Sequence, residues 1–256
     1  MLKTIGDAKI LLFIALAFWL LPPALSAAPD PQAEADALLK SPHLDRQQTL
    51  KALDLYAEAL TRAQPPRTPL LTRLARTCFL VGELTGRSQR QQYYEKGRTY
   101  AEMLVKEEPA RVEGHYWLGM HLCGLADVGG AMQGRKLLPR IMEELERARA
   151  IDEAYDQAGS HRVLGRIYYE APGWPLSVGD IQKSLQHLTA AVRLAPENST
   201  NHLYLAETLK KLNRPDQARQ ELAGVLKAPR HALLPQGLED DRQEARRLLK
   251  EWAASP

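Results

Sequence analysis

Residues 201–211, NHLYLAETLKK, place an alanine directly after a leucine, Leu205-Ala206, and this pair recurs along the chain. Three earlier stretches align with it, each with a leucine followed by a small residue: LLTRLARTCFL (70–80), GHYWLGMHLCG (114–124) and SHRVLGRIYYE (160–170). Their apolar residues recur three and four positions apart, which is the spacing of one face of an α-helix. A small residue beside a large one lets another helix approach closely. The pattern therefore predicts repeated helical units.

The segments that follow two of these stretches fit a second helix. DQARQELAGVL (216–226) and SLQHLTAAVRLAP (184–196), like the four first helices, resemble a tetratricopeptide repeat, with small and apolar residues at the positions that this repeat uses for packing. Pro65, Pro109 and Pro196 each stand three residues before the start of a unit. Proline has no N–H to donate and disfavours helix at the residue before it, so it suits these junctions.

Three of the four units are longer than a tetratricopeptide repeat between their first and second helices. The extra residues number 10, 10 and 7 and lie in VGELTGRSQRQQYYEK (81–96), ADVGGAMQGRKLLPR (126–140) and APGWPLSVGD (171–180). Insertions at equivalent places in a solenoid emerge on the same edge. The fold class expected is therefore all-α, a tetratricopeptide-like helical-hairpin solenoid with insertions between helices A and B, in which Asp180 caps the helix that follows it.

The chain divides into a leader and a helical body. Lys3 and Lys9 precede twelve apolar residues, 10–21, and a small-residue segment, which indicates a signal peptide over 1–28 with an undecided cleavage site. We then expect an N-terminal helical pair (29–67), four repeats (68–111, 112–157, 158–198 and 199–232) and a C-terminal capping helix (233–256). The protein is accordingly expected to be exported and periplasmic, and membrane-associated only through an uncleaved leader or a partner.

Composition and motifs exclude several functions. The 34 Lys and Arg nearly balance the 31 Asp and Glu, giving a formal net charge of +3, so nucleic-acid binding is not expected. Known catalytic and nucleotide-binding motifs are absent, and we expect no enzymatic activity, no cofactor and no metal site. His115, His161 and His202 share one repeat position and are interpreted as hydrogen-bonded core residues. Cys78 and Cys123 are interpreted as buried thiols, with a disulfide as the alternative.

A wider resemblance extends over about residues 40–230. The stretch HYWLGMHLCGLADVGGAMQGRKLLPRIMEELERARAID and the motif YYEAPGWPLSVGD, followed by a second helix and LAPEN, resemble the T-component family associated with TRAP-type transporters. They resemble more distantly the tetratricopeptide domain of the eukaryotic regulators of microtubule dynamics. The first resemblance implies a periplasmic, non-enzymatic helical protein with an internal channel that works with a solute-binding protein. The chain lacks the lipid-attachment cysteine of the tethered members.

The concave groove of such a solenoid is the expected binding site, because one face of each first helix lines it. That face carries Thr72, Arg76 and Phe79 in the first unit, and Cys123 and Leu203 in later ones; the alternative is a solvated helix face. Arginines and aromatic rings together suit an organic anion or an extended peptide. The candidate ligand- or partner-binding residues of the groove and insertion are Tyr116, Met120, Arg162, Arg166, Tyr169, Trp174, Glu207 and Lys210.

Two functions follow from this face. The first is an accessory of a periplasmic solute-uptake system, which predicts a closed cavity near Tyr116, Arg162, Arg166, Tyr169 and Trp174. The second is an envelope scaffold that binds a peptide or subunit in an open groove. Trp174 has two interpretations of its own: its ring caps the helical pair against Tyr168 or Tyr169, or it contacts a ligand at the mouth of a cavity.

Overall fold

The computed structural model describes residues 30–41, 44–229 and 235–254, and within these ranges it contains ten α-helices and no strand. An isolated β-bridge joins Gly173 to Gly179. The expected all-α helical-repeat fold is confirmed. Pro31–Pro256 form one compact unit, separate from Met1–Asp30. The signal peptide expected over 1–28 lies outside the described residues.

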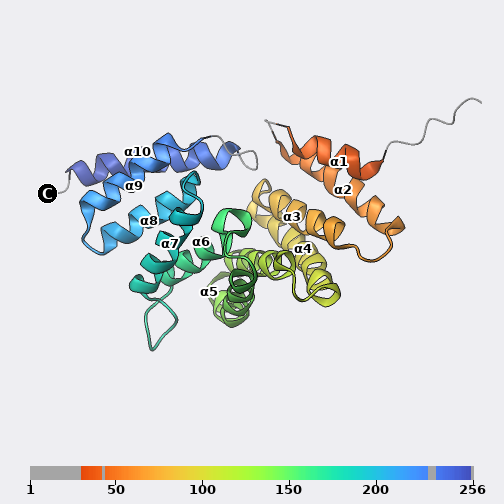
Figure 1. Cartoon of the computed structure of the whole chain (residues 1–256), viewed down its shortest axis with the longest axis horizontal. Helices are drawn as coiled ribbons and strands as arrows, with labels where there is room; N and C mark the ends of the chain where they lie inside the picture. The colour runs from red at the N-terminus through yellow and green to blue at the C-terminus, as the bar shows by residue number, and fades with distance from the viewer. Residues whose placement is uncertain (1–29, 42–43, 230–234, 255–256) are drawn as a thin grey trace, which may run out of the picture. The chain divides into compact units, whose positions relative to one another are not determined.

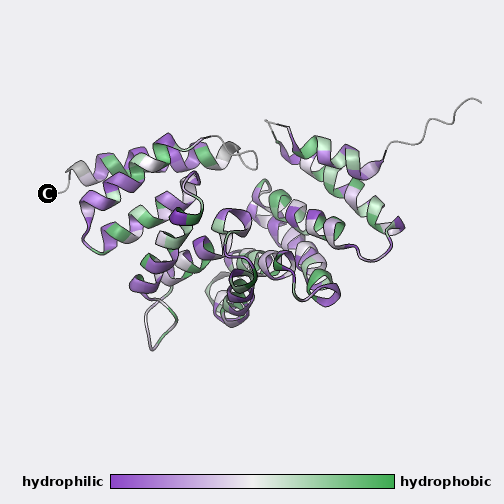
Figure 2. Cartoon of the chain, viewed as in Figure 1, coloured by the Kyte–Doolittle hydropathy of each residue, from purple (hydrophilic) through white to green (hydrophobic). Residues whose placement is uncertain are grey.

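The helices follow one another as antiparallel neighbours (Figure 1). Their bounds are α1 (Pro31–Leu39), α2 (Arg46–Arg62), α3 (Thr68–Glu83), α4 (Arg87–Glu107), α5 (Val112–Ile151), α6 (Tyr155–Glu170), α7 (Ile181–Leu194), α8 (Ser199–Lys211), α9 (Pro215–Lys227) and α10 (Pro235–Ala254). The helices show hydrophobic and hydrophilic residues on different faces (Figure 2). None of the described helices combines the length and hydrophobicity that a membrane span requires.

Helix α5 contains both helices of the second repeat. Its backbone reverses at Gly130, whose φ of 74° lies in the left-handed region that glycine adopts most readily. The two halves then pack against each other: a Cβ atom added at Gly119 would lie 2.8 Å from Leu145. This second insertion therefore has no loop, because it lengthens both helices and joins them through one residue.

The leucine-small pairs hold the helices of each repeat together, as their pattern indicates. Leu74, Leu118, Leu164 and Leu205 are all buried. A Cβ atom added at Gly165 would lie 2.6 Å from Leu188 on α7, so the absence of a side chain there permits close contact. Full burial of such an aliphatic side chain contributes about 1.5–3 kcal/mol, so these repeated contacts supply much of the packing free energy.

The three equivalent histidines form hydrogen bonds in the body of the protein, which confirms their interpretation as structural residues. His115 bonds Glu144 at 2.6 Å and the Pro109 carbonyl at 2.9 Å. His202 bonds Glu221 and the Pro196 carbonyl in the same way, at 2.6 and 2.8 Å. Each of these two rings thus ties a repeat junction to the second helix of the next repeat.

The third repeat uses a different partner. His161 pairs with His187 on α7, with 3.0 Å between the two Nδ1 atoms, and its Nε2 lies 3.4 Å from Glu153. Burial lowers the pKa of both rings, and that of His187 falls to about 4. The neutral forms of both rings are therefore favoured. In the third repeat, His187 occupies the place that Glu144 and Glu221 have beside the equivalent histidines of the other two repeats.

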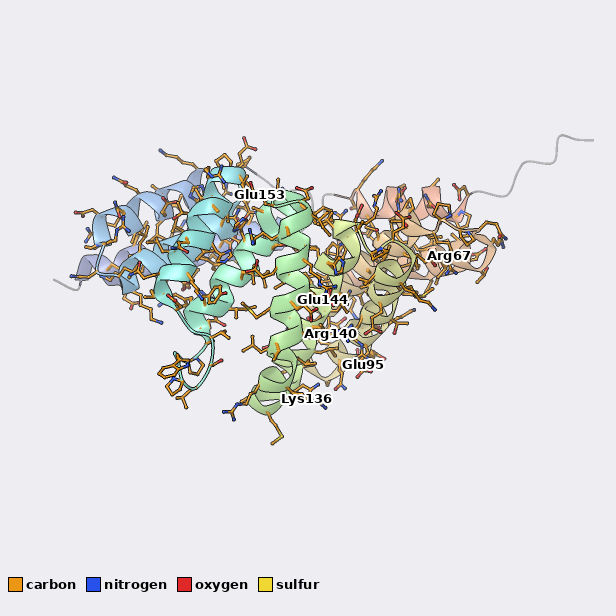
Figure 3. The ribbon with its side chains drawn as sticks, turned by 60° about the horizontal axis from the view of Figure 1, so that its bottom comes forward. Arg67, Glu95, Lys136, Arg140, Glu144 and Glu153 are labelled. Atoms are coloured by element: carbon orange, nitrogen blue, oxygen red, sulfur yellow. The ribbon has the colours of Figure 1, made fainter. Side chains whose placement is uncertain are left out.

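The insertions gather on one edge, as expected for a solenoid. The first lengthens α4, and its Tyr94 ring packs on Gly82 and on Gly124, which lies two residues before the second insertion. A cavity of about 760 Å³, the insertion cavity, lies between the second and third insertions, with Cys123, Leu138 and Leu176 among its lining residues. Figure 3 shows the turn of α5 that carries Lys136 and the 171–180 loop projecting on the same side. The Asp180 carboxylate caps α7, as expected, by accepting from Gln182 and Lys183 N–H.

Candidate functional site

Two adjoining cavities form a groove along the first helices of the repeats. The first cavity has a volume of about 650 Å³ and the second about 530 Å³. Arg76 and Leu80 on α3 line both, so the cavities meet at these residues. The first cavity is built from α1, α2, α3 and α5, and the second from α3, α5, α6, α8 and α10. We refer to the two together as the groove.

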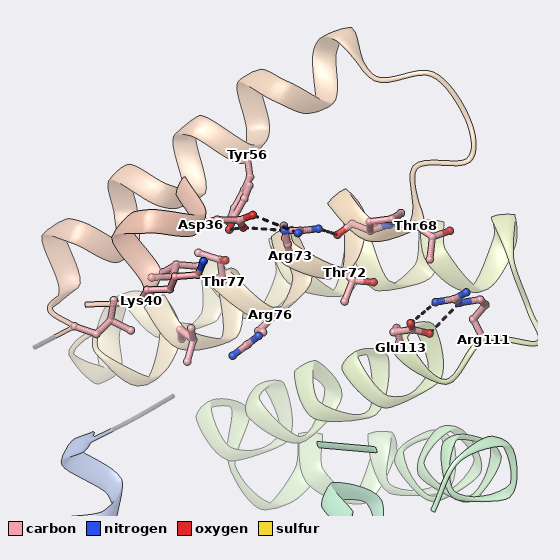
Figure 4. Close-up of a pocket in the computed structure, with 14 residues that line it drawn as sticks. Asp36, Lys40, Tyr56, Thr68, Thr72, Arg73, Arg76, Thr77, Arg111 and Glu113 are labelled. Carbon is pink, nitrogen blue, oxygen red and sulfur yellow. Dashed lines mark hydrogen bonds and ion pairs between the residues drawn. The ribbon is translucent and has the colours of Figure 1, made fainter. Parts of the chain in front are cut away.

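The first cavity is basic. Its charged lining residues are Lys40, Arg73, Arg76 and Arg111 on the positive side and Asp36 and Glu113 on the negative. Arg73 is paired with Asp36 at 2.8 Å, and Arg111 with Glu113 at 2.6 Å (Figure 4). Two of the four cations are therefore neutralised within the molecule.

The Asp36–Arg73 pair is fixed by a third residue. Tyr56 donates its hydroxyl to Asp36 at 2.5 Å, and its ring is buried. Burial acts to raise the pKa of Asp36, but the hydrogen bonds from Arg73 and Tyr56 outweigh it and lower that pKa. The carboxylate thus stays ionised and holds Arg73, which leaves Arg73 committed to α1.

Arg76 is the cation at the centre of the groove without a committed partner. Among the described residues it has no hydrogen bond or ion pair, and Figure 4 draws none to it. Beside it, the hydroxyls of Thr72 and Thr77 are buried without a hydrogen-bond partner, and all three side chains line the first cavity. A half-buried guanidinium next to unsatisfied hydroxyls is suited to an anionic, hydrogen-bonding ligand.

The second cavity is organised around Arg162. Its guanidinium lies 3.1 Å from Asp156, which also accepts the hydroxyl of Tyr116. Burial acts to lower the pKa of Arg162, but the charges of Tyr116 and Asp156 outweigh it and raise that pKa. Asn201, fully buried, accepts from Arg162 at 3.3 Å. Tyr116, Asp156 and Arg162 therefore form one polar network at the wall of the cavity.

A strained segment supports this network. Asp156, Gln157 and Ala158 have φ values of 49°, 58° and 61°, although none is glycine. The left-handed conformation costs about 1–2 kcal/mol for each such residue. The Gln157 carbonyl accepts from Arg162 at 3.2 Å and from Asn201 at 3.2 Å, so these bonds hold the segment in place. Such strain is characteristic of sites with a functional constraint.

Acidic residues of α10 complete the second cavity. Asp240, Asp241 and Leu238 line it together with the start of α8. Asp241 accepts from the hydroxyls of Ser199 at 2.6 Å and Thr200 at 2.8 Å, and burial raises its pKa. With Glu83 and Asp156, the cavity has four acidic lining residues against two arginines. The groove is therefore basic at one end and acidic at the other.

The structure brings three of the predicted site residues into this groove. Tyr116, Met120 and Arg162 line the second cavity, and Thr72, Arg76 and Phe79 of the same predicted face line one or both cavities. Leu203 is buried in the core instead, and its neighbour Tyr204 lines the cavity.

Four other predicted residues lie on α6 and α8 beside the groove. Arg166 pairs with Glu207 and, at 2.6 Å, with Glu170, and its guanidinium lies 5.2 Å from the centre of the Tyr169 ring. Burial acts to lower the pKa of Arg166, but Glu207 outweighs it and the pKa is raised. Lys210 lies 5.3 Å from the Trp252 ring. Arg166 thus already has two carboxylate partners within the chain.

Trp174 corrects one interpretation of the sequence. Its side chain is 88% exposed, so it does not cap the helical pair by burying its ring against Tyr168 or Tyr169. It also does not line the insertion cavity, whose lining residues from this loop include Pro172, Leu176 and Ser177. Backbone hydrogen bonds join the residues of this loop to one another and to α6, while the Trp174 ring stays exposed.

The remaining reactive groups are structural. Cys78 and Cys123 are free, as their interpretation as thiols predicts, and burial raises the pKa of each to about 12. His121 is fully buried, and burial lowers its pKa to about 4. The described ranges contain no group of three or more histidine, cysteine or carboxylate side chains placed to hold a metal ion.

Sequence reasoning missed Asp156, Asn201 and the two aspartates of α10. Asp156 and Asn201 are polar residues in helical segments, and nothing in the sequence marks three non-glycine residues as left-handed. The α10 residues approach the groove only because the helix packs against α8 and α9, which is a tertiary contact. The sequence signal that could have indicated these two residues is the dipeptide Asp240-Asp241, which lies in the helix expected to cap the solenoid.

Comparisons with known proteins define first the class and then the family. The tetratricopeptide-repeat description matches residues 176–234, and the fold is that of a tetratricopeptide-repeat protein, a class that typically serves as protein-interaction scaffolds without catalytic activity. The family described as "Regulator of microtubule dynamics protein 1-3" matches residues 32–175, more than half of the chain. The chain belongs to this family. No curated protein matches it.

A solved structure supports the fold. The chain is similar to a thermophilic tetratricopeptide-repeat protein of Thermus thermophilus, with a TM-score of 0.62 and 22% identity over 86% of this chain and 97% of that one. It also matches the crystal structure of MamA, with a TM-score of 0.47 and 16% identity over 78% of this chain and 93% of that one.

Proposed function

We propose that the protein is an exported scaffold whose groove binds an extended segment of a partner protein. The observation that carries the proposal is the division of charge along one continuous groove. Lys40 and Arg76 are cations without an ion pair in the described ranges, and Asp240 and Asp241 face the same groove at its other end. A segment with an acidic group near Arg76 and a basic group near the two aspartates would pair with both sets of charges.

The geometry favours a chain segment over a closed site for one small molecule. A closed cavity was expected near Tyr116, Arg162, Arg166, Tyr169 and Trp174; in the described part of the chain, Tyr116 and Arg162 line the second cavity of the open groove. The first and second cavities adjoin at Arg76 and Leu80, so a ligand long enough to span both would make more contacts than a compact one. An extended peptide has this shape, and its side chains supply both charges.

The proposal also includes export to the periplasm and the class of the partner protein. Lys3, Lys9 and the apolar residues 10–21 support export to the periplasm. A role as an accessory of a solute-uptake system is supported by the resemblance to the T-component family. Under that role the partner would be a solute-binding protein, whereas an envelope scaffold would bind an assembly subunit.

The test of the groove uses random peptides displayed on phage and selected on the protein. We expect enriched peptides to carry an acidic and a basic residue at a fixed separation. Arg76→Gln should remove the selection for the acid, and Asp240→Asn with Asp241→Asn the selection for the base. Arg87→Gln on α4 is the matched control, because Arg87 is exposed and lies outside the groove. Enrichment without charges, or enrichment unchanged by Arg76→Gln, would overturn the proposal.

The class of partner is tested separately, by capture from an envelope extract followed by mass spectrometry. A captured solute-binding protein supports the uptake accessory, and an assembly factor supports the scaffold. Loss of that partner with Arg76→Gln, but not with Arg87→Gln, links the partner to the groove.

A further inference from the structure

A second surface lies on the edge formed by the insertions. Five large hydrophobic side chains in the described ranges are substantially exposed, and four of them are on two projecting turns. Met132, 88% exposed, follows the Gly130 turn of α5, and Trp174, Leu176 and Val178 on the 171–180 loop are 88%, 70% and 36% exposed. Exposed hydrophobic residues on neighbouring turns of a protein indicate an interaction surface. We call these four residues the apolar edge.

The 171–180 loop holds its apolar residues in a defined position. The N–H of Leu176 donates to the Gly173 carbonyl at 3.0 Å, and that of Gly179 to the Pro172 carbonyl at 2.9 Å. Asp180 N–H donates to the Tyr168 carbonyl at 2.9 Å, which ties the loop to α6. A Cβ atom at Gly179 would lie 2.0 Å from the Ala171 carbonyl oxygen, so only glycine allows this closure. The exposed tryptophan is therefore presented by an ordered loop.

Cations stand beside the apolar residues. Arg135 and Lys136 follow Met132 within about one helical turn, and both are exposed and without an ion pair or hydrogen bond in the described ranges. Figure 3 shows Lys136 at the end of the α5 turn. The acidic residues Asp127 and Glu170 line the insertion cavity between the two turns. The α5 turn thus combines an apolar side chain with two cations that have no direct ion pair in the described ranges.

We infer that the apolar edge docks the protein on an anionic lipid bilayer. The apolar residues stand on two separate turns with a cavity between them, so a broad surface can contact both together. Tryptophan is favoured at the bilayer interface, and each nearby lysine or arginine adds about 1 kcal/mol of attraction to anionic lipid. A second copy of the chain docked through the same edge about a two-fold axis would bring Arg135 and Lys136 toward like charges. This inference is independent of the groove, which lies on the first helices of the repeats.

The test measures binding to vesicles by sedimentation. The chain is used from Pro31, because Pro31–Pro256 form a compact unit and the apolar residues 10–21 would bind lipid by themselves. We expect binding to vesicles of phosphatidylethanolamine and phosphatidylglycerol that exceeds binding to neutral phosphatidylcholine. Trp174→Ser should lower the affinity at least about tenfold, and Arg135→Gln or Lys136→Gln about fivefold each.

Two control variants test whether losing any exposed hydrophobic or basic side chain, away from the apolar edge, also weakens vesicle binding. Ile151→Ser removes a large hydrophobic residue that is 42% exposed elsewhere, and Lys227→Gln removes an exposed lysine on α9. Neither should change vesicle binding. Circular dichroism of each variant checks that it is folded.

Fluorescence provides a second measurement on the same chain. Trp117 and Trp252 are 5% and 7% exposed, so Trp174 is the tryptophan that lipid can reach. Brominated lipid should quench the emission of the wild type but not of Trp174→Ser. Absence of vesicle binding, or binding that Trp174→Ser leaves unchanged, would overturn the inference. Self-association or protein capture that depends on Trp174 without lipid binding would also overturn it and assign the edge to a protein instead.

Discussion

Replacing Gly97 on α4 by alanine tests the closest contact between two repeats. A Cβ atom at Gly97 would lie 2.1 Å from Cε1 and 2.2 Å from Nε2 of His121, so the imidazole must move. His121 is fully buried, and its Nε2 lies 3.0 Å from the Ala75 carbonyl on α3. Moving the ring therefore disturbs the packing of α4 on α5 and the hydrogen bond to α3 together.

The size of the effect follows from three contributions. Overpacking a tight core site costs about 1–3 kcal/mol, and loss of the His121 hydrogen bond costs about 1 kcal/mol. Alanine gains about 1 kcal/mol over glycine in a helix. The free energy of unfolding of Gly97→Ala should therefore fall by about 1–3 kcal/mol, which lowers Tm by roughly 3–10 °C for a unit of this size.

Far-ultraviolet circular dichroism on heating measures this change, with Gly134→Ala as the matched control. The nearest atom to a Cβ at Gly134 is 3.9 Å away, so this variant should gain helix stability and raise Tm. In the background His121→Ala, where the ring is gone, Gly97→Ala should also become stabilising. A Tm of Gly97→Ala equal to or above the wild type would refute the close contact between α4 and α5.

Two further outcomes are expected. Burial lowers the pKa of His187 to about 4, so the neutral ring contributes fully to stability above pH 6.5 and this contribution is lost as the pH falls toward 4. Tm should therefore drop more steeply with acid in the wild type than in His187→Gln. Parallel curves of Tm against pH for the two proteins would contradict the lowered pKa. Tyr116→Phe removes the hydroxyl that donates to Asp156, so chemical denaturation should show that the free energy of unfolding falls by about 1.5–3 kcal/mol. The control Tyr93→Phe should leave this free energy unchanged. Equal denaturation midpoints for Tyr116→Phe and the wild type would argue against the network of Tyr116, Asp156 and Arg162.

The repeats could be predicted from sequence because their signal is local and periodic. The Leu118-Gly119 and Leu164-Gly165 pairs mark helix packing, and the structure places both in the core. The three insertions occur at the same position in their repeats, and for the same reason this predicted that they emerge on one edge of the solenoid. These features depend on the order of residues along single helices, which one sequence contains in full.

Contacts between distant helices could not be predicted in this way. Arg166 was predicted to bind a ligand or partner, and in the structure it pairs with Glu207, 41 residues later in the chain. The Trp174 ring was interpreted either as packing on Tyr168 or Tyr169 or as contacting a ligand, and its 88% exposure contradicts the packing interpretation. The left-handed Asp156 depends on bonds to Tyr116 and Arg162 from two helices. In each case the deciding contacts are set by the folded structure.

The single-residue turn at Gly130 allows the second insertion to vary in length. Because both halves of α5 are helical up to this residue, chain length can be added as equal whole turns on the two sides. Each added turn, about 3.6 residues on each side, would carry Met132 about 5.4 Å farther from the repeats and keep its direction. The distance of Met132 from the repeats can therefore change in evolution or by engineering while the groove, which α5 lines only through its first residues up to Met120, keeps its geometry.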